Sequence, residues 1–381
     1  MNLTLSEEQR LLRESADRFV GETCTADHRR KAAAEPHGFS PAIWKQFAEL
    51  GWLALPIAEE HGGLGGGAVE IGILMEAFGR GLVSEPYLST VVIGAGLIAA
   101  CGSGAQKQAL LPKVADGSLY LAFAHAERAA RFDLGKVATT AAKTPNGFRL
   151  GGHKSAVLDG SAANQLIVSA RLVNANGSSG RLCLFLVPAG TPGVTLSDYP
   201  RLGGGRACSV DLRDVQLPAD ALLGDGSDAL SAVEAVTDRA MAALGSEAVG
   251  IMQALLDTTL EYTRIRKQFG RPLSANQVIR HRLADMAMQC DEARSMALRA
   301  ALMADAEPAA RSRAASGAKA KIGKCARFVA EQSVQLHGAM GVTEELDIGL
   351  YFKRLLAFDT LFGGSAHHYR RHATLGGRIR V

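Results

Sequence analysis

Residues 230–264, LSAVEAVTDRAMAALGSEAVGIMQALLDTTLEYTR, form the longest strongly patterned stretch of the chain. Apolar residues recur there at helical spacing and alanine is frequent, which predicts one long helix. Three more helical patterns follow, at 283–304, 308–336 and 345–361. Long alanine-rich helices with apolar stripes pack as bundles, and their exposed alanine faces predict association with further subunits.

The preceding part of the chain, residues 119–225, has a different pattern. Asn146 and Gly147 lie between two β-like runs and give a hairpin signal. Further short β-like runs, separated by Gly, Asn, Pro and Asp, lie at 165–170, 182–187, 193–196 and 209–217. No helical pattern of about 10–15 residues comes between them, which favours an antiparallel barrel or sandwich over βαβ units.

The N-terminal part is helical in pattern. Ser6 and Gln9 have the spacing of a capping box, and Ser40 followed by Pro41 is a second helix start. Further helical patterns lie at 70–78, 91–100 and 106–114. The predicted fold class is therefore α+β, with an N-terminal all-α domain (1–118), a middle antiparallel β-barrel or sandwich domain (119–225) and a C-terminal four-helix bundle domain (226–381).

Composition sets limits on function. The chain has 381 residues, 47% of them hydrophobic, and a formal net charge of +4, which excludes disorder and gives no case for nucleic acid. No apolar run approaches the roughly 20 residues of a membrane helix. The N-terminus lacks the features of a secretion signal. Six scattered cysteines without C-x-x-C pairing predict a reducing cytoplasm and no zinc site.

Two local motifs have weak functional readings. Gly63, Gly65 and Ala68 match G-x-G-x-x-A, but a dinucleotide phosphate turn needs a preceding strand, and this region is helical. A turn that connects two helices is the favoured reading. His367 and His368 are adjacent and therefore point different ways on a helix, so we predict no metal site there.

A basic cluster ends the long helix. Residues 264–271 read RIRKQFGR. Positive charge at a helix C-terminus compensates the helix dipole. Arginine also binds phosphate or pyrophosphate through two parallel hydrogen bonds. The cluster alone leaves both readings open.

Three segments together resemble the acyl-CoA dehydrogenase family. Residues 262–272, YTRIRKQFGRP, with Asn276-Gln277, resemble the family's R-x-x-F-G…Q signature, and residues 335–341, QLHGAMG, resemble its Q-x-x-G-G-x-G turn. Residues 51–65 are similar to its N-terminal helical domain. The resemblance covers essentially the whole chain and agrees with the α-β-α domain order.

The resemblance implies FAD as cofactor, bound between the β domain and the bundle, with its diphosphate half reaching a neighbouring subunit. It assigns FAD contacts to Arg266, Phe269, Gln277, Gln335, Gly338, Ser365 and His367, with Gln335 and Gly338 near the pyrophosphate across the interface. It implies α,β-dehydrogenation of an acyl-CoA thioester, in which a carboxylate removes the α proton and the β hydrogen leaves as hydride to flavin N5. The implied electron acceptor is an electron-transferring flavoprotein.

The catalytic carboxylate of most family members is missing. Its position corresponds to Gly363, whose backbone N–H remains as a donor to the substrate's thioester oxygen. A second position used by some relatives corresponds to Ala240. Glu247 lies seven residues further on, nearly on the same helix face, and is the predicted base. The alternative is a buried glutamate paired with an arginine at a domain or subunit contact, and Asp238 is a weaker candidate for the base.

The middle domain departs from the family as well. Residues 124–133, AHAERAARFD, replace the T-E-P-x-x-G-S-D loop that helps to bind flavin and substrate. Ala156 and Leu158 replace the Trp and Thr that contact the flavin, which predicts weaker or reoriented flavin binding. Arg128 and Arg131 either face solvent, which is the default, or meet a phosphate or carboxylate.

These departures resemble the small-subunit type of the family, such as the small chain of pimeloyl-CoA dehydrogenase. The leading hypothesis is an FAD-dependent acyl-CoA dehydrogenase subunit, in a homo- or hetero-oligomer (dimer or tetramer) with or without a second homologous subunit. The second is a non-catalytic architectural subunit that completes a partner's FAD site in an α2β2 enzyme. A third keeps the fold but changes the chemistry to an oxidase or monooxygenase.

Overall fold

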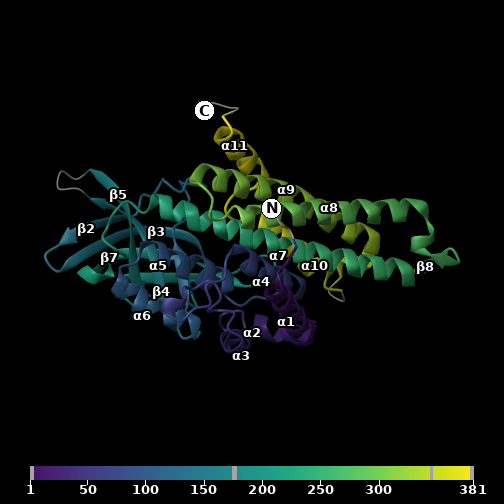
Figure 1. Ribbon diagram of the computed structural model, residues 1–381, viewed down its shortest axis with the longest axis horizontal. Helices are drawn as coiled ribbons and strands as arrows, with labels where there is room; N and C mark the ends of the chain where they lie inside the picture. The colour runs from purple at the N-terminus through teal and green to yellow at the C-terminus, as the bar shows by residue number, and fades with distance from the viewer. Residues whose placement is uncertain (1–3, 174–177, 344–345, 378–381) are drawn as a thin grey trace.

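A computed structural model describes residues 4–173, 178–343 and 346–377. The molecule is elongated, with the β domain at one end and the long helices extending to the other (Figure 1). The N-terminal helices lie along one side, where they contact both. This α-β-α order is the predicted one.

The N-terminal domain consists of short helices. They are α1 (Glu7–Thr23), α2 (Ala26–Ala34), α3 (Pro41–Glu49), the 3-10 helix η1 (Glu59–His61), α4 (Ala68–Gly81), the π-helix η2 (Tyr87–Ala95), α5 (Gly96–Cys101) and α6 (Gly104–Ala115). Ser6 and Gln9 form the predicted capping box, and Ser40 caps α3 through the Ile43 N–H. The glycine-rich run connects η1 to α4, so the helix-connecting turn is confirmed.

The π-helix η2 was not predicted. The apolar pattern at 91–100 indicated an ordinary helix, but the chain forms a π-helix to Ala95 and only then α5. Residues of η2 line both cavities described below. Long π-helical segments are rare and often occur at functional sites, which the apolar pattern alone does not reveal.

The middle domain contains one sheet of seven strands. They are β1 (Leu121–Ala124), β2 (Thr140–Thr144), β3 (Gly147–Leu158), β4 (Gln165–Val173), β5 (Ser179–Pro188), β6 (Val194–Pro200) and β7 (Arg206–Pro218). Their order is β1-β4-β2-β3-β7-β6, with β5 on β4. The predicted hairpin joins β2 and β3. Most pairs are antiparallel, but β1 and β2 both run parallel to β4. The strands β1 and β2 therefore point in the same direction, which the long loop between them allows and a hairpin would not.

The C-terminal domain is the predicted bundle with an additional helix. It contains α7 (Leu230–Ile265), α8 (Gln277–Leu302), α9 (Pro308–His337), α10 (Ile348–Thr360) and α11 (Ser365–Leu375), which packs on α9. The predicted start of the fourth helix at 345 lies outside the described residues. A short hairpin, β8 (Lys267–Gln268) and β9 (Arg271–Pro272), forms the tip between α7 and α8.

Close backbone contact fixes α7 against α4. A Cβ atom on Gly79 would lie 2.1 Å from the Glu247 carbonyl oxygen, and one on Gly250 would lie 1.9 Å from the Glu76 carbonyl oxygen. No side chain fits at either position, so glycine permits the contact. The contact sets where the middle of α7, including Glu247, faces.

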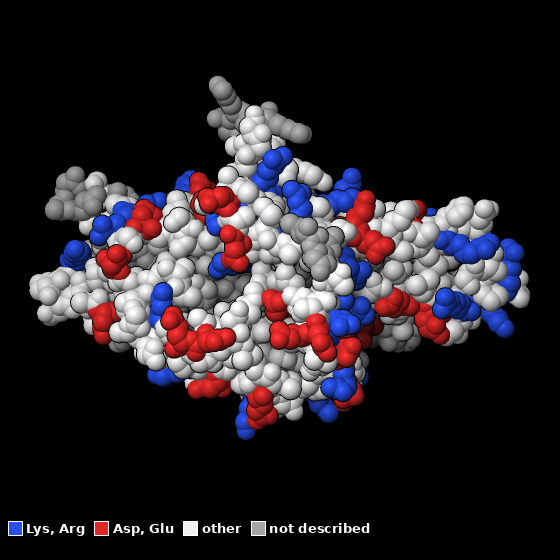
Figure 2. Space-filling model, viewed as in Figure 1, with Lys and Arg blue, Asp and Glu red and all other residues white. Residues whose placement is uncertain are grey.

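The surface carries mixed charge. In Figure 2 acidic and basic residues are both scattered over the visible face, and Lys and Arg gather at the end of the bundle that carries β8. Of the helices in the described ranges, none is long and apolar enough to cross a membrane.

Candidate active site

A cavity of about 390 Å³ lies where the β domain meets the bundle. Its lining comes from η2, β1 and the loop after it, β3, α7, and the segment from Thr360 to Arg371. Its polar lining includes His125, Glu127, Glu234, Thr237, His367 and Arg371. We refer to it as the large cavity.

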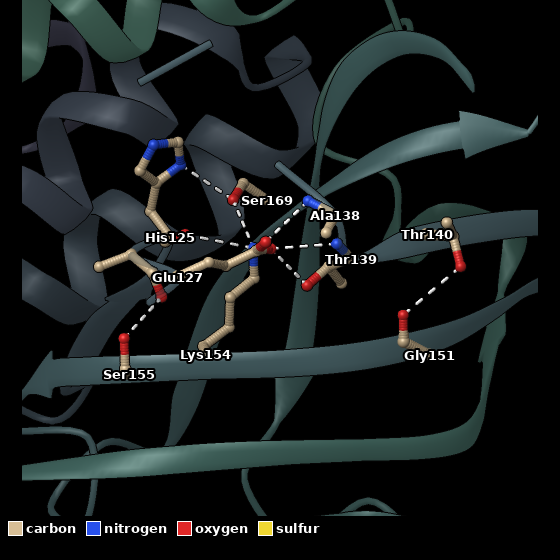
Figure 3. Close-up of polar contacts among 10 residues, drawn as sticks. His125, Glu127, Ala138, Thr139, Thr140, Gly151, Lys154, Ser155 and Ser169 are labelled. Carbon is tan, nitrogen blue, oxygen red and sulfur yellow. Dashed lines mark hydrogen bonds and ion pairs between the residues drawn. The ribbon is translucent and has the colours of Figure 1, made fainter. Parts of the chain in front are cut away.

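A buried ion pair between Glu127 and Lys154 lies on the β-domain side of this cavity, where Glu127 is part of the lining (Figure 3). Lys154 Nζ lies 2.7 Å from Glu127 Oε1 and also donates to the His125 carbonyl and to Ser169 Oγ. Glu127 additionally accepts from Thr139 through both its N–H and its hydroxyl. The three N–H groups of the Lys154 ammonium therefore have three acceptors. This fully bonded network holds the start of the loop after β1 in place.

These contacts shift the pKa values of the group. Burial raises the pKa of the Glu127 carboxyl, but hydrogen bonds from Lys154 and Thr139 outweigh it and hold the pKa at about 2. Burial lowers the pKa of Lys154 to about 8, against the opposing effect of Glu127. Burial, assisted by the Lys154 cation, lowers the pKa of His125 to about 4, so this imidazole is neutral at neutral pH. Glu127 cannot serve as a base, because its carboxylate is stabilised in the charged form.

Strained backbone gathers around the large cavity. Arg131, Ala156 and Phe362 all line it, and all have positive φ angles, of 53°, 52° and 57°. Ala156 lies at a register shift between β3 and β7. Residues other than glycine adopt such angles at a cost of about 1–3 kcal/mol each, and such strain clusters at functional sites.

Two buried side chains, Lys319 and His368, form hydrogen bonds with backbone carbonyls of the segment that contains Gly363. Lys319 Nζ donates to the carbonyls of Phe358 and Gly363, at 2.8 and 2.9 Å. His368 Nε2 lies 3.0 Å from the Phe362 carbonyl oxygen. Burial lowers the pKa of Lys319 to about 8 and that of His368 to about 3.

Gly363 itself is buried and does not line the large cavity. Its φ of 112° lies in the region that favours glycine. Its N–H is directed at the Thr360 carbonyl, at 3.4 Å. The role of this N–H as a donor to substrate stays a prediction.

Glu247 lines a second, smaller cavity of about 40 Å³. Its Oε1 lies 2.7 Å from Arg354 Nε and 2.6 Å from the same guanidinium's second nitrogen, and its side chain is 6% exposed. The small cavity shares Leu158 and Leu361 with the large one, but Glu247 does not line the large cavity. The structure therefore contains the ion pair that sequence analysis gave as the alternative, and Glu247 as the base stays a prediction.

Neither the empty family position on α7, Ala240, nor the weaker candidate, Asp238, provides a free base. Ala240 is fully buried in the apolar core. Asp238 is also buried, and its carboxylate pairs with Arg311 and Arg371 and accepts from Ser312. Asp238 thereby orients Arg371, whose side chain lines the large cavity.

The predicted FAD contacts of the first two motifs lie far along the bundle. Arg266, Phe269 and Gln277 are exposed at its tip, Phe269 completely and with a φ of 52°. Gln335 and Gly338 are exposed at the end of α9. The two motifs are in direct contact. Tyr262 donates to the His337 carbonyl and stacks on the His337 ring, with centroids 4.3 Å apart.

The third set of predicted contacts lies at the start of α11. Ser365 donates to Asp359 Oδ1, while His367 is half-buried, lines the large cavity and packs on Phe132. Neither His367 nor His368 faces solvent freely. The described part of the chain contains no cluster of three potential metal ligands.

Sequence analysis missed several residues of the large cavity. Glu127 and Lys154 were considered only as parts of altered family motifs. An acidic residue in one flavin segment and a lysine in the next could have predicted the ion pair between them. Glu234 and Arg371 gave no local signal, since only the fold brings them to the cavity. Lys319, which donates to the Gly363 carbonyl, gave none either.

Family models match the chain in three consecutive segments. They are the N-terminal domain of acyl-CoA dehydrogenase over residues 6–118, the middle domain over 122–215 and the C-terminal domain over 231–373. The chain belongs to the acyl-CoA dehydrogenase family. The probable acyl-CoA dehydrogenase YngJ of Bacillus subtilis (strain 168) is 32% identical over 355 residues, which cover 91% of this chain and 92% of YngJ.

Two solved structures are similar to this chain over nearly its whole length. The steroid ACAD Tcur3481-Tcur3483 is 29% identical with a TM-score of 0.87, covering 98% of this chain and 99% of that one. A chain of the ChsE4-ChsE5 complex from Mycobacterium tuberculosis is 26% identical with a TM-score of 0.87, covering 100% of both. Both support the α+β fold with a helical bundle.

FAD is the cofactor of this chain, as of its family. The large cavity fits it, because the cavity lies at the predicted junction of β domain and bundle and offers the aromatic rings of Phe123, Phe132 and Phe362 for contact with a flat ring system. Ala156 lines the cavity with a small side chain. Arg371 and Thr237 supply polar groups on the bundle side.

Proposed function

We propose that this chain catalyses α,β-dehydrogenation of an acyl-CoA thioester as one subunit of a heteromeric acyl-CoA dehydrogenase, with a homologous partner. The observation that carries the proposal is the large cavity, which brings α7, the Gly363 segment and the β-domain loop together around one space. FAD, when bound, accepts the β hydrogen of the substrate as hydride. The chain's own groups hold the substrate, exclude water and move the α proton.

The case for a partner rests on two observations. Both family positions for the catalytic carboxylate are empty, at Gly363 and Ala240, and the flavin contacts at 156 and 158 are reduced to Ala and Leu. The names of two structural relatives, Tcur3481-Tcur3483 and ChsE4-ChsE5, each describe two chains together. A second, homologous subunit can supply what this chain lacks.

A bulky acyl group suits the large cavity. Ala156 widens it, and most of its lining is apolar. One relative is a steroid ACAD, which supports this class of substrate. The electron acceptor that the family context supports is an electron-transferring flavoprotein. The cytoplasmic location stays a prediction, to which the six free cysteines are suited.

An anaerobic visible spectrum tests the proposal. The chain is purified alone and co-expressed with a homologous subunit, then titrated with butyryl-CoA and with a steroid-side-chain CoA thioester. We expect bound flavin in the complex and bleaching by the bulky thioester. A complex that binds flavin but is never bleached would contradict the proposal.

A filled-cavity variant separates catalysis from an architectural role. Ala130→Trp places a large side chain into the lining of the large cavity from a loop position. We expect it to abolish bleaching in the complex. Undiminished bleaching would assign the chemistry to the partner's own site and leave this chain as the architectural subunit.

A further inference from the structure

Of the three carboxylates that line the large cavity, two are already engaged. Glu127 is paired with Lys154 at 2.7 Å. Asp133 lies on an exposed loop and accepts from the Gly135 N–H at 2.9 Å. Of these three carboxylates, Glu234 alone has neither a hydrogen bond nor an ion pair to any residue that the structure describes. The cavity therefore has one free carboxylate.

Three imidazoles also line the cavity, and, like the carboxylates, they differ in whether they have a hydrogen-bond partner. His125 Nδ1 lies 2.9 Å from Ser169 Oγ, and His368 Nε2 lies 3.0 Å from the Phe362 carbonyl oxygen. Across the ranges that the structure describes, neither ring nitrogen of His367 has a hydrogen-bond partner. His367 is the one imidazole of the cavity with both nitrogens available.

The ring of His367 occupies the space beside Gly363. A Cβ atom built on Gly363 would lie 2.8 Å from His367 Cδ2. The ring is packed between Phe132 and His368, with centroid distances of 5.2 and 4.9 Å, so its position is defined by contacts on two sides. A side chain at 363 would have to displace this imidazole to enter the cavity.

We propose that His367 is the general base of this chain, and that its imidazole takes the place of the carboxylate absent from position 363. The inference rests on the proposed dehydrogenation. A ring nitrogen of His367 takes the proton from the substrate's α carbon, and the electrons of the broken C–H bond form the new Cα=Cβ bond. The β hydrogen leaves with its electron pair as a hydride, which FAD would accept when bound. The acyl group is thereby oxidised by two electrons.

The surroundings of His367 keep it in the neutral form that a base requires. Burial lowers its pKa, and the cations of Arg371, Arg370 and Lys319 act in the same direction. The lowered pKa favours the unprotonated ring at neutral pH. The same cations favour release of the proton after the reaction.

Glu234 is the competing base. It lies on α7 six residues before Ala240, which is roughly 9 Å along the helix axis from that family position. His367, in contrast, adjoins the other family position directly. Geometry therefore favours the imidazole, and the experiment below includes both residues.

Deuterium exchange isolates the proton transfer from the redox step. The full chain with FAD, alone and in complex with a homologous subunit, is incubated in D₂O with 3,3-dimethylbutyryl-CoA. This thioester has α hydrogens but no β hydrogen, so it cannot be oxidised. Mass spectrometry measures deuterium at the α carbon, and the visible spectrum measures retained flavin.

We expect His367→Gln to slow the exchange at least 100-fold while flavin remains bound, which is the scale of general-base catalysis. The matched control His153→Gln changes a half-exposed histidine that pairs with Asp211 and does not line the cavity, and it should leave the exchange rate unchanged. Exchange that persists in His367→Gln, or that is lost only in Glu234→Gln, would overturn the assignment. Absence of exchange in the unmodified chain, with FAD and with the subunit, would overturn it too.

The outcomes distinguish this inference from the proposed function. Exchange that depends on His367, without bleaching by any oxidisable acyl-CoA, would remove the dehydrogenation but keep the base. Bleaching at an unchanged rate in His367→Gln would keep the dehydrogenation and remove the base. Loss of flavin together with exchange would identify His367 as the cofactor contact that the family resemblance implies and would overturn its role as base.

Discussion

The two cavities share Leu158 and Leu361 but differ in how their charged groups are paired. In the small cavity the carboxylates of Glu85, Asp159 and Glu247 all accept hydrogen bonds. In the large cavity Glu127 on the β-domain side is likewise paired, but within the described residues Glu234 and His367 on the bundle side have no hydrogen-bond partner. Buried polar groups that are fully paired contribute to one defined structure, whereas unpaired ones are available for chemistry.

The largest expected effect comes from breaking the pair on the β-domain side. Lys154→Met leaves Glu127 as an uncompensated buried charge and should lower the free energy of unfolding by about 3–5 kcal/mol, measured by urea denaturation. Lys45→Met, in an exposed pair with Glu49, is the control and should change it by no more than about 0.5 kcal/mol. Equal effects of the two variants would contradict the contrast between buried and exposed pairs.

A smaller effect is expected in the small cavity. Glu247→Gln removes the charge that Arg354 binds and should lower the free energy of unfolding by about 1–3 kcal/mol, while α-proton exchange continues. Denaturation and the exchange assay are run on the same variant. Loss of exchange with unchanged stability would restore Glu247 as the base and reverse the comparison between the cavities.

The smallest effect per group is expected from mild acid. The buried imidazoles of His125 and His368 have pKa values lowered to about 4 and about 3, so between these values and 6.5 the unfolded chain binds more protons than the folded one. Stability is therefore complete above pH 6.5 and falls as the pH decreases, by less than about 1.4 kcal/mol per imidazole between pH 7 and pH 6. Glu127 adds a further loss between 4.5 and about 2. Melting temperatures that rise from pH 7 to pH 5 would contradict this.

Local signals in the sequence predicted the elements well. Ser6 with Gln9, Ser40 with Pro41, and the turn at Gly147 act within a few residues, so the chain alone specifies them. The π-helix η2 has the same apolar pattern as an α-helix. The parallel pairing of β1 with β4 depends on the path of the whole chain segment between the two strands. Neither has a local signal.

The candidate site could be predicted only where a family motif marks it. Gly363 was found by its place in such a motif, and Glu247 by its spacing of seven residues from the family position at Ala240. The partners that decide their roles lie far off in sequence, as Arg354 does from Glu247 and Lys319 does from Gly363. Periodicity carries no information about such contacts, because they arise from tertiary packing.

Arg354 has a consequence for how the molecule unfolds. From α10 its guanidinium contacts Glu247 on α7, the Val83 carbonyl of the N-terminal domain and the carbonyls of Gly203 and Gly204 in the β domain. One side chain thus connects all three domains at the junction where their cores meet. Heat should disrupt them together, in one cooperative calorimetric transition, and none of the three should survive excision as an independently folding fragment.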